Sequence, residues 1–202
     1  MSIGMVDVDR SMRSPVDDLR DGRPVIVQSE GADMSYLVLS GKCATARSVA
    51  FVVRWTTGFL RVTVTDAIRH RLELPLLSTA CSGSDSPQFA VSVDASFGIK
   101  TGISAADRAH TVRVIADPAS SPSDLTRPGH VVPVRTDCTA TVDRWSMSEY
   151  AATLARLGGL GPATVFSEIT DDRGQLATAT DAREFAAVYD LALINSRDLR
   201  GA

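Results

Sequence analysis

The sequence predicts an α+β fold in a single domain. Helix-like and strand-like segments are interspersed without the strict strand–helix–strand alternation of a parallel α/β protein. The length of 202 residues suits one domain with a sizeable core. A hydrophobic fraction of 44% with 22% charged residues is typical of a soluble, globular chain.

The first part of the chain predicts one helix followed by two strands. Ser14 is a suitable N-cap, Pro15 suits the first helical position, and Gly22 is expected to end the helix. The apolar runs at 24–27 and 36–39 predict buried strands, which residues 28–35 join as a loop.

The remaining elements follow from alternation and capping signals. Residues 59–64 alternate and are β-branched, which predicts a strand. Ser104 and Asp107 begin a helix that runs to about 116, and Ser146 and Glu149 form a capping box for a helix that ends at Gly158. Further elements are expected as strands at 89–94, 163–170 and 191–194, a helix at 180–189, and a Ser- and Pro-rich loop at 118–128.

Composition excludes several classes of partner. The net charge of −3 provides no basic patch for nucleic acid and no polybasic segment for a membrane surface. No apolar run approaches the roughly 20 residues that span a bilayer, and residues 1–13 lack the apolar core of a signal peptide. Three widely spaced cysteines suggest reduced thiols. We therefore expect a cytoplasmic protein.

Four segments, in order, carry a family resemblance. They are TGISAADRA at 101–109, RPGH at 127–130, ATLARLGGL at 152–160, and a strand and turn at 165–177 that contains Glu168. Together they resemble the 3,4-dihydroxy-2-butanone 4-phosphate synthase family over roughly residues 15–200. The resemblance implies an α/β sandwich with a mixed sheet over 14–202, preceded by an extension at 1–13. It also implies a homodimer with sites near the subunit interface.

The resemblance implies a lyase that releases the fourth carbon of ribulose 5-phosphate as formate. This chemistry needs a divalent cation to stabilise enediolate charge and carboxylates to move protons. The family supplies them from an acidic loop, a strand cysteine and a His-Thr pair.

The sequence departs from the family at the metal side. Residues 28–36 are about two residues shorter than the acidic loop and retain Glu30 and Asp33. Met147 stands in the place of the metal histidine, and a thioether is a poor ligand for Mg²⁺. Arg61 stands in the place of the cysteine. We therefore expect no cofactor, with Mg²⁺ as the alternative if synthase activity is retained.

Other positions complete the candidate site. Trp55 and Phe97 replace residues that are often histidine, and Trp145 replaces alanine, which makes the expected pocket more apolar. The TGIS turn at a helix N-terminus suits an anion. The candidate catalytic residues are Glu168, His130, Asp107 and Glu30. The candidate substrate-binding residues are Arg144, Ser148, Thr101, Ser104, Arg108, Arg127, Met147, Trp55, Arg61, Trp145 and Phe97.

Three functions remain open on the sequence. The leading hypothesis is a repurposed enzyme that acts without magnesium on a small, partly apolar metabolite by isomerisation, dehydration or cyclisation. The first alternative is an authentic synthase with a rearranged metal site that uses Glu30, Asp33 and Glu168. The second is a non-catalytic protein that binds a ligand or pairs with an intact paralogue.

Overall fold

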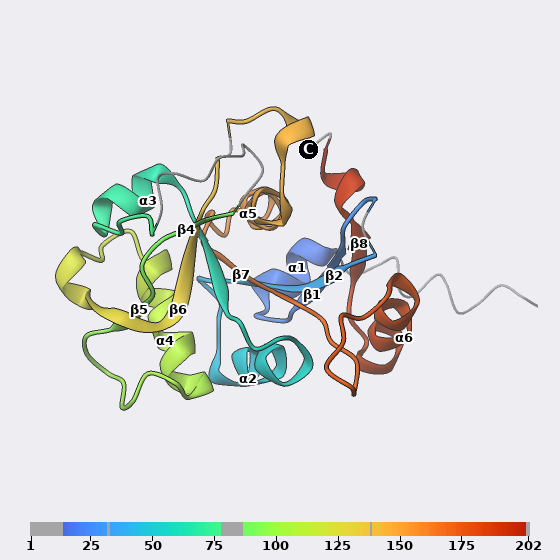
Figure 1. Ribbon diagram of the computed structural model, residues 1–202, viewed down its shortest axis with the longest axis horizontal. Helices are drawn as coiled ribbons and strands as arrows, with labels where there is room; N and C mark the ends of the chain where they lie inside the picture. Colours follow the sequence, from blue (N-terminus) through green and yellow to red (C-terminus); the bar gives the residue numbers. More distant parts are fainter. Residues whose placement is uncertain (1–13, 32, 78–86, 138, 201–202) are drawn as a thin grey trace, which may run out of the picture.

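One mixed sheet organises the described part of the chain (Figure 1). The structure, a computed structural model, describes residues 14–31, 33–77, 87–137 and 139–200. The strands are β1 (Val25–Gln28), β2 (Ser35–Ser40), β3 (Arg61–Val64), β4 (Gln88–Phe89), β5 (Val93–Ala95), β6 (Leu125–Arg135), β7 (Thr164–Glu168) and β8 (Leu193–Asn195). The helices are α1 (Pro15–Arg20), α2 (Ala46–Trp55), α3 (Asp66–Arg71), α4 (Ala105–Ala116), α5 (Met147–Leu157) and α6 (Ala179–Tyr189), with short 3-10 turns η2 (Pro122–Asp124), η3 (Val142–Arg144) and η4 (Ser196–Leu199).

Both parallel and antiparallel pairs occur in this sheet. The strand order is β4-β6-β3-β7-β2-β1-β8, and β5 pairs with β6. The β1–β8 and β3–β6 pairs are parallel, whereas β2 and β3 both run antiparallel to the central strand β7. The single domain with a mixed sheet and helices confirms the predicted α+β fold.

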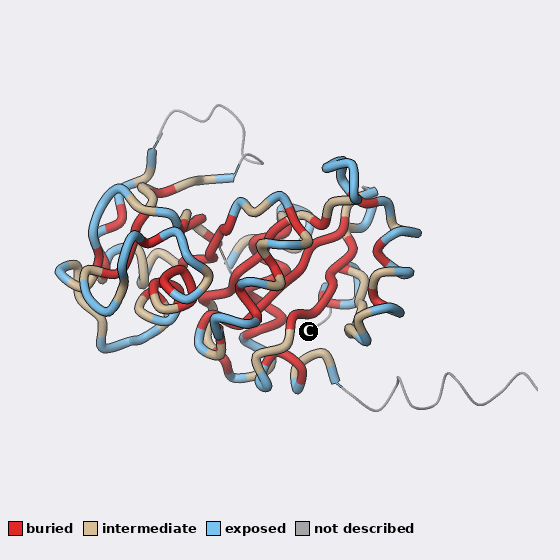
Figure 2. The backbone as a smooth tube through the Cα atoms, turned by 90° about the horizontal axis from the view of Figure 1, so that it is seen from below, coloured by how far each residue is buried: buried red, intermediate tan, exposed pale blue. Residues whose placement is uncertain are grey.

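Helices cover the sheet on both faces, so its central strands are buried on both sides. Successive residues along β1, such as Val25 and Ile26, point to opposite faces and enter two separate hydrophobic clusters. One cluster joins the sheet to α2, α4 and α6, and the other joins it to α1 and α5. Figure 2 shows the resulting band of buried residues through the middle of the molecule.

The predicted helix starts are confirmed by their hydrogen bonds. The hydroxyl of Ser14 accepts the Val16 N–H at 3.3 Å, and that of Ser104 accepts the Asp107 N–H at 3.0 Å. The Ser146 capping box is also present. Such side-chain acceptors satisfy donors that a helix start leaves unpaired.

The sequence reading missed α2 and α3 and misplaced the start of β6. The Thr45–Ser48 capping box begins α2, with serine where glutamate is the usual signal. A loop was expected up to residue 128, because prolines such as the two in this segment argue against a strand. The structure instead begins β6 at Leu125. The expected strand at 89–94 is two short pieces, β4 and β5.

Some expectations fall outside the described residues, among them the N-terminal extension at 1–13 and two of the three cysteines, Cys81 and Cys138. Cys43 is a free thiol. Each helix in the part of the chain that the structure describes is too short or too polar to cross a membrane.

Candidate active site

Three neighbouring strands bring a buried ion pair together at the centre of the sheet. Tyr36 on β2 lies opposite Glu168 on β7, and Arg61 on β3 lies opposite Phe166 on β7. Nη2 of Arg61 is 2.5 Å from Oε2 of Glu168, and the two side chains are 10% and 17% exposed. A charge this buried requires a partner, so Arg61 explains how β7 tolerates a carboxylate.

Aromatic rings surround the Arg61 guanidinium. Its central carbon lies 4.5 Å from the ring centre of Phe166 and 5.5 Å from that of Phe59, which favours a cation. Within the described residues, Nε of Arg61 has no hydrogen-bond partner. The pair therefore keeps one buried donor for another oxygen.

Tyr36 is a neutral neighbour of this pair. Burial raises the pKa of its hydroxyl, the charge of Glu168 raises the pKa further, and Arg61 acts in the opposite direction. The protonated hydroxyl donates to the Met34 sulfur at 3.9 Å.

A second buried acid, Asp94 on β5, holds His130 on β6. Oδ2 of Asp94 is 2.7 Å from Nδ1 of His130, and Oδ1 accepts the His130 backbone N–H at 3.0 Å. The Asp94 side chain is 8% exposed and that of His130 is 40% exposed. Because the carboxylate accepts the Nδ1 proton, Nε2 is the nitrogen left to exchange protons. Sequence reasoning missed Asp94, although an acid in an expected strand is itself a signal.

Glycines let the TGIS and RPGH segments approach this pair. A Cβ on Gly102 would lie 2.1 Å from Oδ2 of Asp94 and 2.8 Å from Nδ1 of His130. Gly102 also has a φ of +83°, which glycine adopts without strain. The retained glycine is therefore required by close packing against the acid–histidine pair.

The first turn of α4 adds Asp107 and Arg108, and both are buried. Oδ2 of Asp107 accepts the Gly102 N–H at 3.1 Å, which shapes the turn. Nη1 of Arg108 lies 3.5 Å from the Gly58 carbonyl oxygen, and its Nε has no partner among the described residues. Burial lowers the pKa of Arg108, whereas the charge of Asp94 raises it.

The Gly58 turn connects these two groups of residues. Thr57, next to Gly58, has its Oγ1 3.4 Å from Oε2 of Glu168. The ring of Phe59, on the other side of Gly58, contacts Arg61. Arg108 therefore reaches the same turn that borders the Arg61–Glu168 pair.

The start of α5 and the 3-10 turn before it carry four further predicted residues. Met147 is buried in the same hydrophobic cluster as Tyr36 and Phe166. The Ser148 hydroxyl donates to Glu149 at 3.1 Å, and Nε1 of Trp145 donates to the Ala140 carbonyl at 3.0 Å. Arg144 is exposed and has no ion-pair partner within the described ranges.

Within the described residues, four predicted site residues take no part in these contacts. The Trp55 ring packs against α6, and Phe97 is 77% exposed. Arg127 donates to the carbonyls of three residues and so ties loops together. Glu30 forms an ion pair of 2.9 Å with Arg200. The TGIS residues Thr101 and Ser104 are exposed.

The fold and these segments define the class, a single-domain sandwich with a mixed sheet whose site combines buried acids and arginines. A family model described as 3,4-dihydroxy-2-butanone 4-phosphate synthase matches residues 13–201, and the chain belongs to this family.

Several known proteins are similar to this chain. It is 41% identical over 180 residues to the riboflavin biosynthesis protein RibBA of Salinispora arenicola, covering 88% of the chain and 43% of that protein. For RibBA of Nocardia farcinica the identity is 40% over 188 residues, covering 91% and 45%. The chain thus spans about half the length of these curated relatives.

Solved synthase structures have the same fold. The Candida albicans 3,4-dihydroxy-2-butanone 4-phosphate synthase superposes with a TM-score of 0.84 at 29% identity, covering 92% of this chain and 93% of that chain. A synthase in complex with two magnesium ions gives 0.82 at 30% identity, covering 91% and 92%.

These relatives correct two expectations. The hypothesis of a repurposed, magnesium-free enzyme is wrong, because the family match and the riboflavin-pathway relatives support its synthase alternative. The expectation of no cofactor is overturned by the related structure that holds two magnesium ions. Substitution at single positions such as Met147 was too narrow a basis for either conclusion.

The candidate acids Glu30, Asp33 and Glu168 have the donor atoms that bind magnesium, but each is engaged by another partner in this structure. Carboxylate oxygens are the ligands Mg²⁺ prefers. Glu168 is paired with Arg61, Glu30 with Arg200, and Oδ1 of Asp33 accepts the Ala179 N–H at 2.6 Å. Within the described residues no three His, Cys, Asp or Glu side chains group closely enough to hold a metal ion.

Proposed function

We propose that this protein is a 3,4-dihydroxy-2-butanone 4-phosphate synthase of riboflavin biosynthesis, which converts ribulose 5-phosphate to its product and formate. The observation that carries the proposal is the His130–Asp94 pair, in which the RPGH segment supplies His130 and the TGIS turn packs against both side chains. The family membership over residues 13–201 supports the same reaction. A cytoplasmic location accords with it.

His130 is the proposed proton-transfer group. Asp94 orients the imidazole and stabilises the positive charge that develops when Nε2 accepts a proton. Half-exposure of the ring leaves Nε2 accessible to a substrate hydroxyl or carbon acid. Glu168 is the second candidate, and Arg61 and Thr57 fix its carboxylate.

Arginines provide the binding and electrostatic part of the proposal. Arg61 and Arg108 are buried, and each keeps an Nε donor without a partner among the described residues. Such donors stabilise oxyanions more strongly in a buried site than in water. Arg144, exposed and without an ion-pair partner in the described part of the chain, is the proposed anchor for the substrate phosphate.

Magnesium is the proposed cofactor. When bound, it supplies stabilisation of negative charge on neighbouring substrate oxygens. The carboxylates of Glu30, Asp33 and Glu168 are its candidate ligands by donor chemistry, and each would have to leave its present partner.

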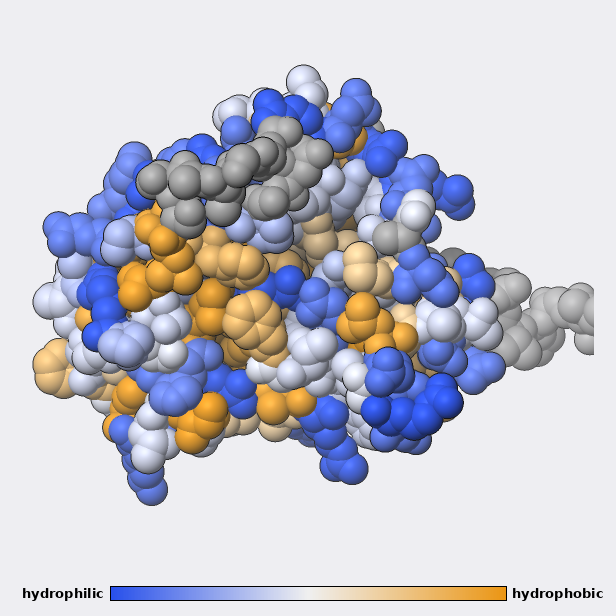
Figure 3. Space-filling view, in the orientation of Figure 1, coloured by the Kyte–Doolittle hydropathy of each residue, from blue (hydrophilic) through white to orange (hydrophobic). Residues whose placement is uncertain are grey.

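A homodimer is part of the proposal. Phe59 and Ile103 are 45% and 53% exposed, and each belongs to a segment that borders the site. Figure 3 shows apolar side chains gathered over the central part of one face. Exposed apolar groups beside a site suit a subunit interface. Light scattering tests this, and a monomer at assay concentration would remove the shared interface.

The decisive test is formate release from ribulose 5-phosphate with added Mg²⁺. We expect turnover that falls strongly in His130→Asn and in Glu168→Gln. An exposed acid in the turn that follows β7, Asp172, provides the control Asp172→Asn. Absence of formate from the folded wild-type chain would refute the proposed reaction.

A further inference from the structure

An aromatic cluster between α2 and α6 lies outside the proposed site. Trp55 and Phe51 project from α2 and meet Phe185 and Tyr189 from α6. The centroids of the Trp55 and Tyr189 rings are 5.2 Å apart. Trp55 was expected in the catalytic pocket, so the proposed synthase reaction leaves this residue without a role.

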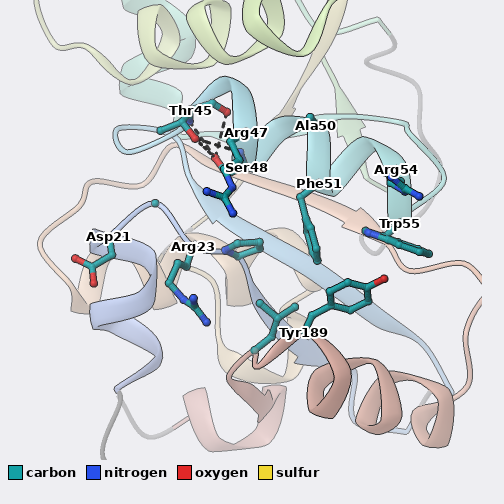
Figure 4. Close-up of a pocket in the computed structure, with 13 residues that line it drawn as sticks. Asp21, Arg23, Thr45, Arg47, Ser48, Ala50, Phe51, Arg54, Trp55 and Tyr189 are labelled. Atoms are coloured by element: carbon teal, nitrogen blue, oxygen red, sulfur yellow. Dashed lines mark hydrogen bonds between the residues drawn. The ribbon is translucent and has the colours of Figure 1, made fainter.

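A cavity of about 770 Å³ opens beside this cluster. Phe51, Trp55 and Tyr189 form one side, and the other sides are the turn at 21–24 and the first turn of α2 (Figure 4). The volume lies within the usual range for small-molecule sites, and such sites combine aromatic walls with a few polar groups.

Arginines give the cavity a positive rim. Arg23, Arg47 and Arg54 line it, whereas Asp21 is the one acid among its lining residues. The Arg54 guanidinium lies 5.1 Å from the ring centre of Trp55. Arg47 has no ion-pair or hydrogen-bond partner within the described residues, and in Figure 4 it extends from α2 toward the cavity.

The other polar groups are less available to a ligand. Thr45 and Ser48 bond to each other at 3.0 Å in the α2 capping box. Arg23 is engaged by Asp18 at 3.1 Å and by Asp190 at 3.7 Å. Arg47, with Arg54, therefore supplies the free positive charge beside the aromatic wall.

We propose that this cavity binds a small planar aromatic ring that carries a phosphate or a similar anionic group. The ring would stack on the exposed parts of Trp55 and Tyr189. The anionic group would accept bidentate hydrogen bonds from Arg47, with Arg54 nearby. The lining residues take no part in the Arg61–Glu168 or Asp94–His130 pairs. The inference therefore does not depend on the synthase reaction.

Calorimetric titration of the wild-type chain with three probes separates the two halves of the proposal. Adenosine 5′-monophosphate carries both a ring and a phosphate, adenosine carries the ring alone, and inorganic phosphate carries the charge alone. We expect the monophosphate to bind at least about tenfold more tightly than either half, the difference expected from one charge-assisted hydrogen bond or one stacking contact.

Two variants place the binding on this cavity. Arg47→Gln should weaken monophosphate binding by about tenfold or more, and Trp55→Leu should weaken it as well. The matched control is Arg183→Gln, because Arg183 is exposed on α6 and does not line the cavity. Thermal unfolding shows whether Trp55→Leu folds. If Trp55→Leu does not fold, Arg47→Gln still provides the test, because it changes an exposed side chain.

Four outcomes would overturn the proposal. The first is no monophosphate binding up to about 10 mM. The second is equal affinity for one of the half probes. The third is unchanged affinity in folded Arg47→Gln. The fourth is Trp55 fluorescence that iodide cannot quench, measured in Trp145→Phe so that Trp55 is the remaining tryptophan. That result would mean that a second subunit covers the cavity.

Discussion

Replacing Asp94 with asparagine tests how the structure activates His130. The variant keeps an oxygen for the His130 backbone N–H at 3.0 Å but removes the charge that faces Nδ1 at 2.7 Å. A charge-assisted hydrogen bond of this kind contributes roughly 1.5–3 kcal/mol. If that energy is expressed in the transition state, kcat for formate release should fall about 10- to 150-fold, with a smaller change in KM.

The assay is formate production coupled to a formate dehydrogenase, at saturating ribulose 5-phosphate and Mg²⁺. Asp172→Asn, at an exposed position, is the matched control for the same chemical change. Thermal unfolding separates loss of fold from loss of catalysis. A folded Asp94→Asn with kcat within about twofold of wild type would refute the orienting role of Asp94.

Three further predictions address pH, packing and metal. Hydrogen bonds from Arg135 lower the pKa of Asp66 to about 2, below its unfolded value of about 3.9, so its stabilisation is present above pH ~4 and is lost as the pH falls toward 2. Asp66→Asn should therefore lower the free energy of unfolding near pH 7, by no more than about 1 kcal/mol for this part-exposed pair, and have a clearly smaller effect near pH 2; an equal effect at both pH values would contradict this. Gly102→Ala should cost about 2 kcal/mol or more in urea unfolding, because its Cβ would meet Asp94. Gly161→Ala, with a φ of +80° and open space, should cost only roughly 1 kcal/mol, and equal losses would refute the clash. Chelation with EDTA should abolish formate release and added Mg²⁺ should restore it if magnesium is the proposed cofactor; an unaffected rate would argue against the cofactor.

Local signals were sufficient for most helix boundaries. Ser14, Ser104 and Ser146 cap the helices they were expected to cap, since capping depends on residues within one turn. The signal failed where Ser48 replaced the usual glutamate in the α2 capping box. It also failed in β6, where pairing with β3 and β5 overrides the prolines.

The candidate site was only partly predictable for a different reason. Motifs identified Glu168 and His130, but their partners depend on strand register. Arg61 meets Glu168 because β3 and β7 are neighbours in the sheet, and Asp94 meets His130 across 36 residues of sequence. Sequence spacing does not encode either contact, so both the Arg61 pairing and the role of Asp94 required the fold.

The position of β7 has a consequence for hydrogen exchange. This strand has β3 and β2 on its two edges and hydrophobic clusters on both faces. Its amide protons can therefore reach solvent only when the whole sheet opens, whereas β8, at the edge, can separate locally. The slowest-exchanging amides should thus lie in the strand that carries Glu168, which places this acid on the least mobile backbone of the molecule.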